Sequence, residues 1–205
     1  MIKKMKTALI LSFIIIAIFV ALQAFSSMNT NSVEKQKYIV LKKSNDFEIR
    51  SYNEAIIASV KLKGNYEEIS GDGFRVLAGY IFGKNHQDVK IAMTSPVYMD
   101  FADSVTTMSF VMPSEYKKED LPAPVDERVS IEDLNNGIVA VLSFGGYAST
   151  QKINDKIDEL KHYLKVEKLE YFGNFKFLGY NPPFQVLNRR NEIMVQIKYQ
   201  AETKH

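Results

Sequence analysis

The sequence contains no cysteine among its 205 residues. This absence excludes disulfide bonds, thiolate metal sites, iron–sulfur clusters and prosthetic groups attached through thioether bonds. It also excludes a lipid anchor carried on a cysteine side chain. Because a protein without cysteine suits either side of a membrane, the redox compartment stays open.

The chain also lacks a strong excess of charge of one sign, since its formal net charge is +2. Residues 1–25 hold three lysines and no acidic residue, so the remainder has 23 basic and 24 acidic residues. A remainder this balanced has no electrostatic footprint for DNA or RNA. We therefore expect no nucleic-acid partner.

Motifs typical of catalysis are missing as well. The sequence has no Ser/His/Asp arrangement, no metal-ligand spacing and no phosphate loop, because KGNYEE and SGDGFR have too few glycines at the wrong spacing. One carboxylate is suggestive, since Glu192 opens the last predicted strand. Its side chain is either the counter-ion of a cationic ligand or a surface or arginine-paired glutamate. One carboxylate without an evident partner supports little acid–base chemistry, so we predict a protein that is not an enzyme.

The N-terminus carries a long uncharged run behind a lysine-rich start. Residues 7–25 are 19 uncharged positions, and a helix of that length spans about 28 Å, close to the thickness of a bilayer core. Residues 1–25 are either a signal peptide, cleaved after Ala24, or an uncleaved membrane anchor, which the apolar run Ala8–Leu22 favours. In both cases the lysines stay in the cytoplasm. The sequence thus predicts a domain on the outer side of the cytoplasmic membrane, or a secreted one.

The rest of the chain contains a repeat. SVKLKGNY (59–66) matches AVLSFGGY (140–147), and both segments precede a helical pattern. The second helix shows an apolar stripe with Ser149 or Thr150 placed to cap it, formed by Ile153, Ile157, Leu160 and Leu164. Two strand-like pairs follow, VKIAMTSP with FKFLGYNP and TTMSFVMP with NEIMVQIKY. The unit is therefore β-α-β-β, used twice, and Pro96 and Pro182 are expected at equivalent corners.

The composition, 46% hydrophobic and 24% charged, suits one globular domain of about 150–180 residues. We predict an α+β fold in which the duplicated units form one curved antiparallel sheet with two main helices, preceded by a hydrophobic N-terminal helix. A groove between sheet and helix is the natural ligand site. Three glycines interrupt the first helix at Gly71, Gly73 and Gly79, either for close helix–sheet packing or to leave a bare face for a flat ligand.

Several segments in order resemble the SOUL haem-binding protein family. They are YIVLKKSNDFEIRSY (38–52), GYIFG (79–83), KIAMTSPV (90–97), SFVMPSEY (109–116), LPAPVDERV (121–129), GYNPPF (179–184) and RRNEI (189–193). KIAMTSPV and the terminal RRNE are the most specific. The resemblance indicates a domain over residues 37–200, after a polar tether at 26–36 and before a tail at 201–205. It implies a distorted antiparallel barrel, similar to bacterial effector-binding domains, and reversible, non-covalent binding of haem or another tetrapyrrole.

The resemblance does not carry over an iron ligand. In some animal members a proposed ligand histidine follows Ile-Arg of an E-I-R motif, but here Ser51 follows Arg50. Of the three histidines, His86 lies in a predicted loop, His162 on the polar side of the second helix and His205 in the tail. We therefore expect labile haem without a strong axial ligand, and no metal site.

Binding by shape then requires an apolar surface for the porphyrin and basic groups for its propionates. The first helix offers Phe74, Leu77, Ala78 and Ile81, with Arg75 as its only base, and Arg189 and Arg190 are alternative anchors. Two other functions stay open. One is a binding module for another flat or cationic molecule that uses Glu192, and the other is a hydrolase or haem-modifying enzyme that uses the same glutamate.

Overall fold

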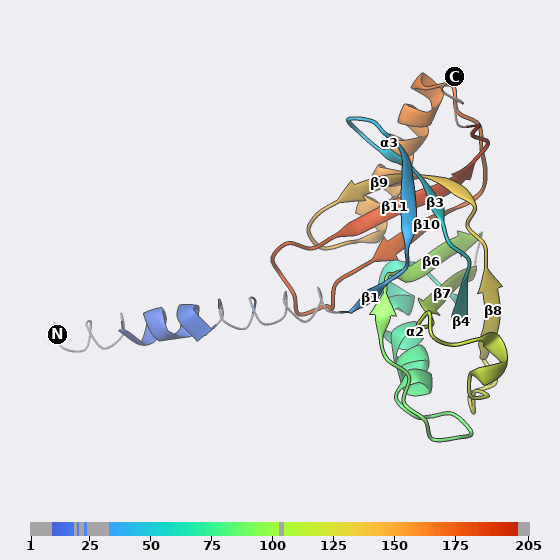
Figure 1. Ribbon diagram of the computed structural model, residues 1–205. Helices are drawn as coiled ribbons and strands as arrows, with labels where there is room; N and C mark the ends of the chain where they lie inside the picture. The colour runs from blue at the N-terminus through green and yellow to red at the C-terminus, as the bar shows by residue number, and fades with distance from the viewer. Residues whose placement is uncertain (1–9, 19, 21–22, 24–32, 103–104, 201–205) are drawn as a thin grey trace.

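The computed structural model describes residues 10–18, 20, 23, 33–102 and 105–200. Nine strands form one strongly curled antiparallel sheet in the order β2-β3-β9-β11-β10-β6-β7-β4-β8, and β1 and β5 form a short parallel pair (Figure 1). The strands are β1 (Glu34–Lys35), β2 (Tyr38–Lys43), β3 (Glu48–Tyr52), β4 (Ala55–Lys63), β5 (Thr94–Ser95), β6 (Val97–Ala102), β7 (Val105–Val111), β8 (Val129–Leu134), β9 (Ile138–Phe144), β10 (Tyr171–Gly179) and β11 (Asn191–Ile197). Between residues 33 and 200 the described helices are α2 (Tyr66–Ile81), α3 (Thr150–Val166) and the short 3-10 helix η1 (Lys118–Asp120).

The predicted duplication is confirmed. One unit is β4-α2-β6-β7 and the other is β9-α3-β10-β11. The units meet in the middle of the sheet, where β6 pairs with β10. The strand that precedes each unit joins the opposite one, since β3 pairs with β9 and β8 pairs with β4. The first unit is therefore extended by β8, which precedes the second unit, and the second unit is extended by β3, which precedes the first.

Local sequence explains where the helices begin. Asn65 accepts a hydrogen bond from the backbone N–H of Glu68, whose carboxylate accepts one from the Asn65 N–H, a capping box that starts α2. Ser149 caps α3 by accepting from the Lys152 N–H, which selects Ser149 over Thr150. α2 ends at Ile81 with Phe82 as its C-cap, before Gly83 at φ 108°.

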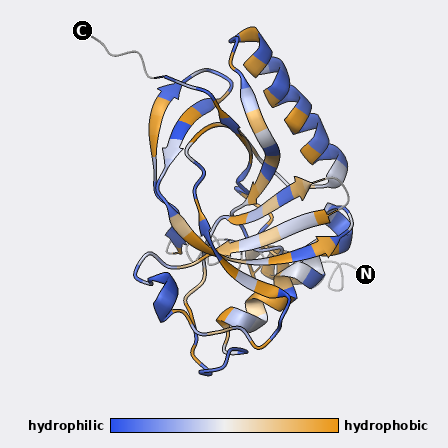
Figure 2. Ribbon diagram, turned by 90° about the vertical axis from the view of Figure 1, so that its right-hand side faces the viewer, coloured by the Kyte–Doolittle hydropathy of each residue, from blue (hydrophilic) through white to orange (hydrophobic). Residues whose placement is uncertain are grey.

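The sheet has two different faces because successive strand residues point to opposite sides. One face packs under α2 and α3 and forms the main core, to which Leu77, Tyr80 and Ile81 of α2 and Ile153, Leu160 and Leu164 of α3 contribute. Figure 2 shows α3 with its hydrophobic side toward the sheet. The other face carries a smaller cluster that includes Tyr52, Tyr98, Tyr180 and Met194.

The glycines of α2 have different roles. A Cβ on Gly73 would lie 2.9 Å from Leu62 Cδ1 and 3.0 Å from Met108 Sδ, so this glycine allows close packing of helix on sheet. A Cβ on Gly71 would meet nothing within 4 Å, and one on Gly79 would face the flexible side chain of Lys84. Close packing therefore explains Gly73, while Gly71 leaves the helix surface open.

The expected equivalence of the two prolines is wrong. Pro96 follows a cis peptide bond and directly precedes β6, whereas Pro182 lies three positions beyond the end of β10. Since β6 and β10 run antiparallel with Val97 opposite Gly179, both prolines lie at the same end of this strand pair. A twofold relation between the units would place them at opposite ends. Each proline nevertheless lies outside the strands, where its missing N–H is tolerated.

At the N-terminus, residues 10–18 are helical and exposed. Within the described parts of the chain, no helix has the length and apolar character needed to span a bilayer. Much of the predicted anchor at 1–25 and of the tether at 26–36 lies outside the described residues, as does the tail at 201–205.

Candidate functional site

A buried carboxylate lies on the sheet face that the helices leave uncovered. Glu192 is the second residue of β11, and its side chain has no exposed surface. Strand alternation separates it from its neighbours Ile193 and Val195, which belong to the core under the helices. An isolated buried charge is strongly unfavourable, so the groups around Glu192 determine what it does.

Two arginines neutralise this carboxylate. Arg50 of β3, itself only 2% exposed, donates from Nη1 to both Glu192 oxygens at 3.0 and 3.1 Å. Arg190 donates to Oε1 from Nε at 3.0 Å and from Nη2 at 2.7 Å. The Ser143 hydroxyl donates to Oε1 and the Tyr180 hydroxyl to Oε2. Every carboxylate oxygen of Glu192 therefore has several donors.

Both guanidinium groups are held by further contacts. Arg50 donates from Nε to Glu48 at 2.8 Å and lies 4.3 Å from the centre of the Tyr38 ring. Arg190 donates to the Tyr38 hydroxyl and lies 4.2 Å from the Tyr180 ring centre. Burial alone would lower the pKa of Arg50, but the charge of Glu192 raises that pKa above its ordinary value. Both arginines therefore stay charged.

Tyrosine hydroxyls surround the cluster and resist ionisation. Burial, followed by the charge of Glu192, raises the pKa of Tyr52 to about 12. The pKa of Tyr180 is raised well above its ordinary value by the same two causes. Burial is also the main cause that raises the pKa of Tyr98, whose hydroxyl donates to Gln36 and accepts from Asn136. Tyr52, Tyr98 and Tyr180 therefore keep their phenolic protons in mildly alkaline solution.

The raised pKa values predict how stability depends on pH. Tyrosines of the unfolded chain ionise near pH 10, so the stabilising effect of keeping these phenols protonated is complete below about pH 10 and is lost as the pH rises toward about 12. Tyrosinate absorbance and urea unfolding at increasing pH measure this, with the urea-unfolded chain as the control. The prediction fails if all 11 tyrosines of the folded chain ionise together near pH 10 without unfolding.

The geometry does not favour the functions proposed for Glu192 from the sequence. A counter-ion for a cationic ligand needs a negative charge that the protein has not neutralised, and a catalytic base needs an accessible lone pair. Arg50, Arg190, Ser143 and Tyr180 occupy both oxygens of Glu192. The arginine-paired interpretation of Glu192 is therefore the correct one. The cluster fixes β3, β9, β10 and β11 to one another.

The predicted haem-binding residues of α2 do not form one surface. Leu77 and Ile81 are 0% and 1% exposed because they lie on the side of α2 that packs on the sheet. They present no surface to a ligand in this structure, and their role as haem contacts stays a prediction. Phe74 is 37% exposed and has its ring centre 5.3 Å from that of Phe110. Ala78 is half-buried, and Arg75 is exposed and pairs with Asp72 at 3.0 Å.

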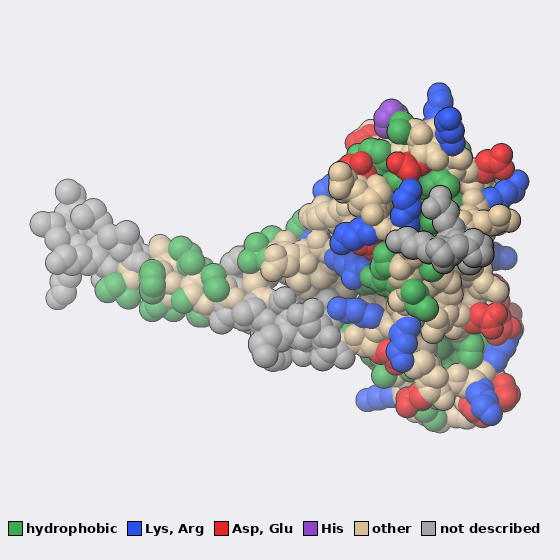
Figure 3. Space-filling view, turned by 45° about the horizontal axis from the view of Figure 1, so that its top comes forward, with side chains coloured by type: hydrophobic (Ala, Val, Ile, Leu, Met, Phe, Trp, Pro, Cys, Tyr) green, Lys and Arg blue, Asp and Glu red, His purple; other side chains and the backbone are tan. Residues whose placement is uncertain are grey.

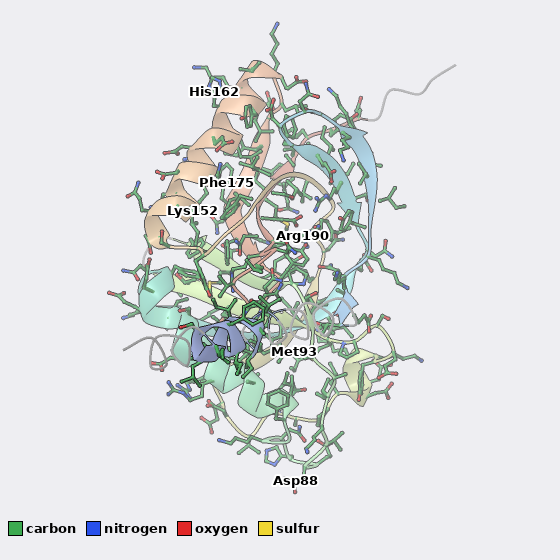
Figure 4. The ribbon with its side chains drawn as sticks, turned by 90° about the vertical axis from the view of Figure 1, so that its left-hand side faces the viewer. Asp88, Met93, Lys152, His162, Phe175 and Arg190 are labelled. Carbon is green, nitrogen blue, oxygen red and sulfur yellow. The ribbon has the colours of Figure 1, made fainter. Side chains whose placement is uncertain are left out.

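The two alternative arginines lie in different environments. Arg190 belongs to the Glu192 cluster, and Figure 4 shows it near the centre of the domain. Arg189 lies 4.4 Å from the Tyr147 ring centre and donates from Nη1 to the carbonyls of Pro182 and Gln185. Its buried Nε has no hydrogen-bond partner. Arg189 therefore mainly holds the backbone of the connection between β10 and β11.

Neither of the two histidines that the structure describes is placed to bind iron inside a pocket. His86 and His162 are exposed, and Figure 4 shows His162 at the far end of α3, while His205 lies outside the described residues. Ser51, which replaces the proposed ligand, alternates with Arg50 along β3 and so points away from the Glu192 cluster. Within residues 33–102 and 105–200, no group of three or more His, Asp or Glu side chains is arranged to hold a metal ion.

Comparison with known proteins matches residues 33–196 to the family described as SOUL heme-binding protein. The chain belongs to the SOUL family. Heme-binding protein 2 of Mus musculus is 36% identical over 156 residues, which cover 72% of this chain and 76% of the mouse protein. Heme-binding protein 1 of Xenopus laevis is 28% identical over 155 residues, covering 72% and 81%. This SOUL chain is therefore related to haem-binding proteins over most of its domain.

Solved structures show the same fold at much lower identity. The C-terminal domain of EcmrR matches with a TM-score of 0.59 at 7% identity, covering 74% of this SOUL chain and 96% of that domain. A protein of Listeria innocua described as a hydrolase matches with a TM-score of 0.51 at 10% identity, covering 84% and 97%. At these identities the likeness shows the fold alone. It confirms the expected similarity to bacterial regulator domains.

Sequence reasoning missed most partners of Glu192, although a signal was present. Arg50 lies in EIRSY and Glu192 in RRNEI, two of the segments that carry the SOUL resemblance. The structure brings them together across 142 residues of sequence. Tyr52 and Tyr180 also come from these SOUL segments. Polar side chains that recur on one face of the strands in these segments are the sequence signal that would have located the cluster.

Proposed function

We propose that this SOUL protein binds haem or a related tetrapyrrole non-covalently and without catalysis, and that it buffers or carries haem on the outer side of the cytoplasmic membrane. Family membership over residues 33–196 is the observation that carries the proposal. The lysine-rich start and the uncharged run at 7–25 support the location.

The outer side of α2 is the surface that we assign to the porphyrin. Phe74 offers an exposed aromatic ring, and Ala78, one turn further along, is small enough for a flat ligand to approach the helix. Met93 is 38% exposed, on a segment joined to the end of α2 by a 2.8 Å hydrogen bond from the Ile91 N–H to the Ile81 carbonyl. Figure 4 shows Met93 on the same side of the domain as α2. Together these residues supply apolar contact beside the core.

Arg75 is the base best placed to meet a propionate at this surface. Its partner Asp72 is one turn away on the same helix, and the two side chains are 79% and 65% exposed. A surface ion pair of this kind contributes about 0–1 kcal/mol, so exchanging Asp72 for a propionate costs little. Phe74, Arg75 and Ala78 offer no iron ligand, so affinity at this surface comes from apolar contact and charge, and iron coordination stays labile.

A hemin titration of the full chain tests the proposal. We expect a Soret shift with a stoichiometry near one, and a loss of affinity of at least about tenfold for Phe74→Asp, since an unpaired charge then faces an apolar plate. His86→Ala and His162→Ala should each change the affinity by less than about threefold. Val125→Asp, at a loop position 57% exposed, is the matched control and should have no effect.

Two results would contradict this assignment. An unchanged hemin spectrum at micromolar protein would show that the protein does not bind haem. Loss of the Soret shift in His86→Ala, with Phe74→Asp still binding, would show that coordination holds the haem. Circular dichroism and thermal unfolding of each variant verify that it is folded at the temperature of the titration.

A further inference from the structure

The connection between β10 and β11 exposes an uncharged apolar surface. Phe184, Val186 and Leu187 are 66%, 42% and 54% exposed, and no residue from Pro182 to Leu187 carries a charge. We call residues 182–187 the apolar loop. Neighbouring exposed hydrophobic side chains on a loop often mark an interaction site, whereas scattered ones do not.

The backbone of the apolar loop is bonded within the protein. Arg189 Nη1 donates to the carbonyls of Pro182 and Gln185, and the Gln185 side chain, 2% exposed, donates to the carbonyl of Leu187. The Tyr147 hydroxyl donates to the Pro183 carbonyl. Pro182 and Pro183 themselves have no N–H to satisfy. The loop therefore turns its polar backbone inward while its apolar side chains face out, which is what a segment needs to enter the edge of a lipid layer.

The apolar loop is also attached to the N-terminal segment. The Gln23 amide donates to the Phe184 carbonyl at 3.2 Å and accepts from the N–H of Val186 at 2.8 Å. Gln23 is 7% exposed. Figure 1 shows the β10–β11 connection reaching to the side from which the N-terminal helix departs, and Figure 3 shows hydrophobic side chains along that helix. One glutamine side chain thus links the apolar loop to the N-terminal segment.

We propose that the apolar loop inserts into the surface of the lipid bilayer beside the N-terminal helix. Gln23 lies two residues before the end of the uncharged run 7–25, which is where a spanning helix of that length would leave the apolar layer. The clamp by Gln23 holds Phe184, Val186 and Leu187 at this level. The loop then fixes how the domain is oriented on the membrane; this role rests on the membrane location proposed above and not on haem binding.

Because the chain has no cysteine, single cysteines allow a direct test. Full chains carrying Leu187→Cys or Phe184→Cys are labelled with the polarity-sensitive dye NBD and reconstituted into phosphatidylcholine–phosphatidylglycerol vesicles. We expect NBD emission to shift to shorter wavelength and to lose intensity when the lipids carry a doxyl quencher near the headgroup. Val125→Cys, labelled in the same way on another exposed loop, should show neither change. Adding Gln23→Ala to Leu187→Cys should reduce both changes.

Each alternative outcome overturns the proposal. Labels at 184 and 187 that stay unshifted and unquenched in vesicles show that the loop remains in water. A label at 125 that responds equally shows general adsorption of the domain. A shift at 187 that appears without vesicles and grows with protein concentration assigns the loop to a second copy of the chain. Equal thermal unfolding of the labelled variants verifies that each of them is folded.

Discussion

Replacing Glu192 by alanine should lower the free energy of unfolding by about 3–5 kcal/mol, the usual cost of breaking a buried ion pair by removing one partner. Arg50 is 2% exposed, and its Nη1 donates to both Glu192 oxygens. The variant leaves this buried guanidinium with Glu48 as its remaining ionic partner. Arg190 loses its hydrogen bonds to Glu192 at the same time. Urea unfolding followed by circular dichroism measures the effect.

Glu170→Ala is the matched control, because Glu170 pairs with Lys198 at 2.9 Å while both side chains are more than two-thirds exposed. This substitution should leave stability nearly unchanged, because water and salt screen an exposed ion pair. Replacing Arg50, Arg190 and Glu192 together by methionine or leucine should cost less than Glu192→Ala alone, since no charge is then left unpaired. Equal effects of Glu192→Ala and Glu170→Ala would show that the buried cluster does not stabilise the fold.

Replacing Leu77 by alanine should cost about 2–5 kcal/mol of stability, since the side chain is fully buried and the removed atoms leave a cavity under α2. Phe74→Ala on the same helix should cost less, because more than a third of Phe74 is exposed. Chemical unfolding of both variants measures the difference. At a temperature where Leu77→Ala is still folded, it should bind hemin within about threefold of the unchanged chain.

That pair of substitutions separates core from binding surface on one helix. If Leu77→Ala left stability unchanged but abolished the Soret shift, Leu77 would be a ligand contact and its buried position in the free protein would not be the binding-competent one. If both variants destabilised equally, Phe74 would belong to the core as well.

Much of the fold follows from local patterns in the sequence. The β-α-β-β repeat shows in matched strand and helix segments, and the cap at Ser149 depends on neighbouring residues alone. The proline comparison failed for a physical reason. The chain enters β6 directly after Pro96 but leaves β10 before Pro182. The two similar sequence segments therefore lie at opposite ends of equivalent strands.

The candidate site was harder to predict from the sequence than the fold. On α2 the same apolar spacing fits a core stripe and a ligand surface, and only packing on the sheet separates Leu77 and Ile81 from Phe74. Glu192 and Arg50 meet through strand order, because β3 pairs with β9 and β9 pairs with β11. That order depends on pairing between distant segments, which no local pattern specifies.

The leading strands β3 and β8, which precede the two β-α-β-β units, are exchanged between these units. β3 completes the half that contains β9, and β8 completes the half that contains β4. In a chain with one repeat alone, the strand before the unit would lack the partner that the other unit supplies, and two such chains could provide it by exchanging these strands. The domain therefore has, within one chain, the strand order of a homodimer whose two subunits exchange their leading strands.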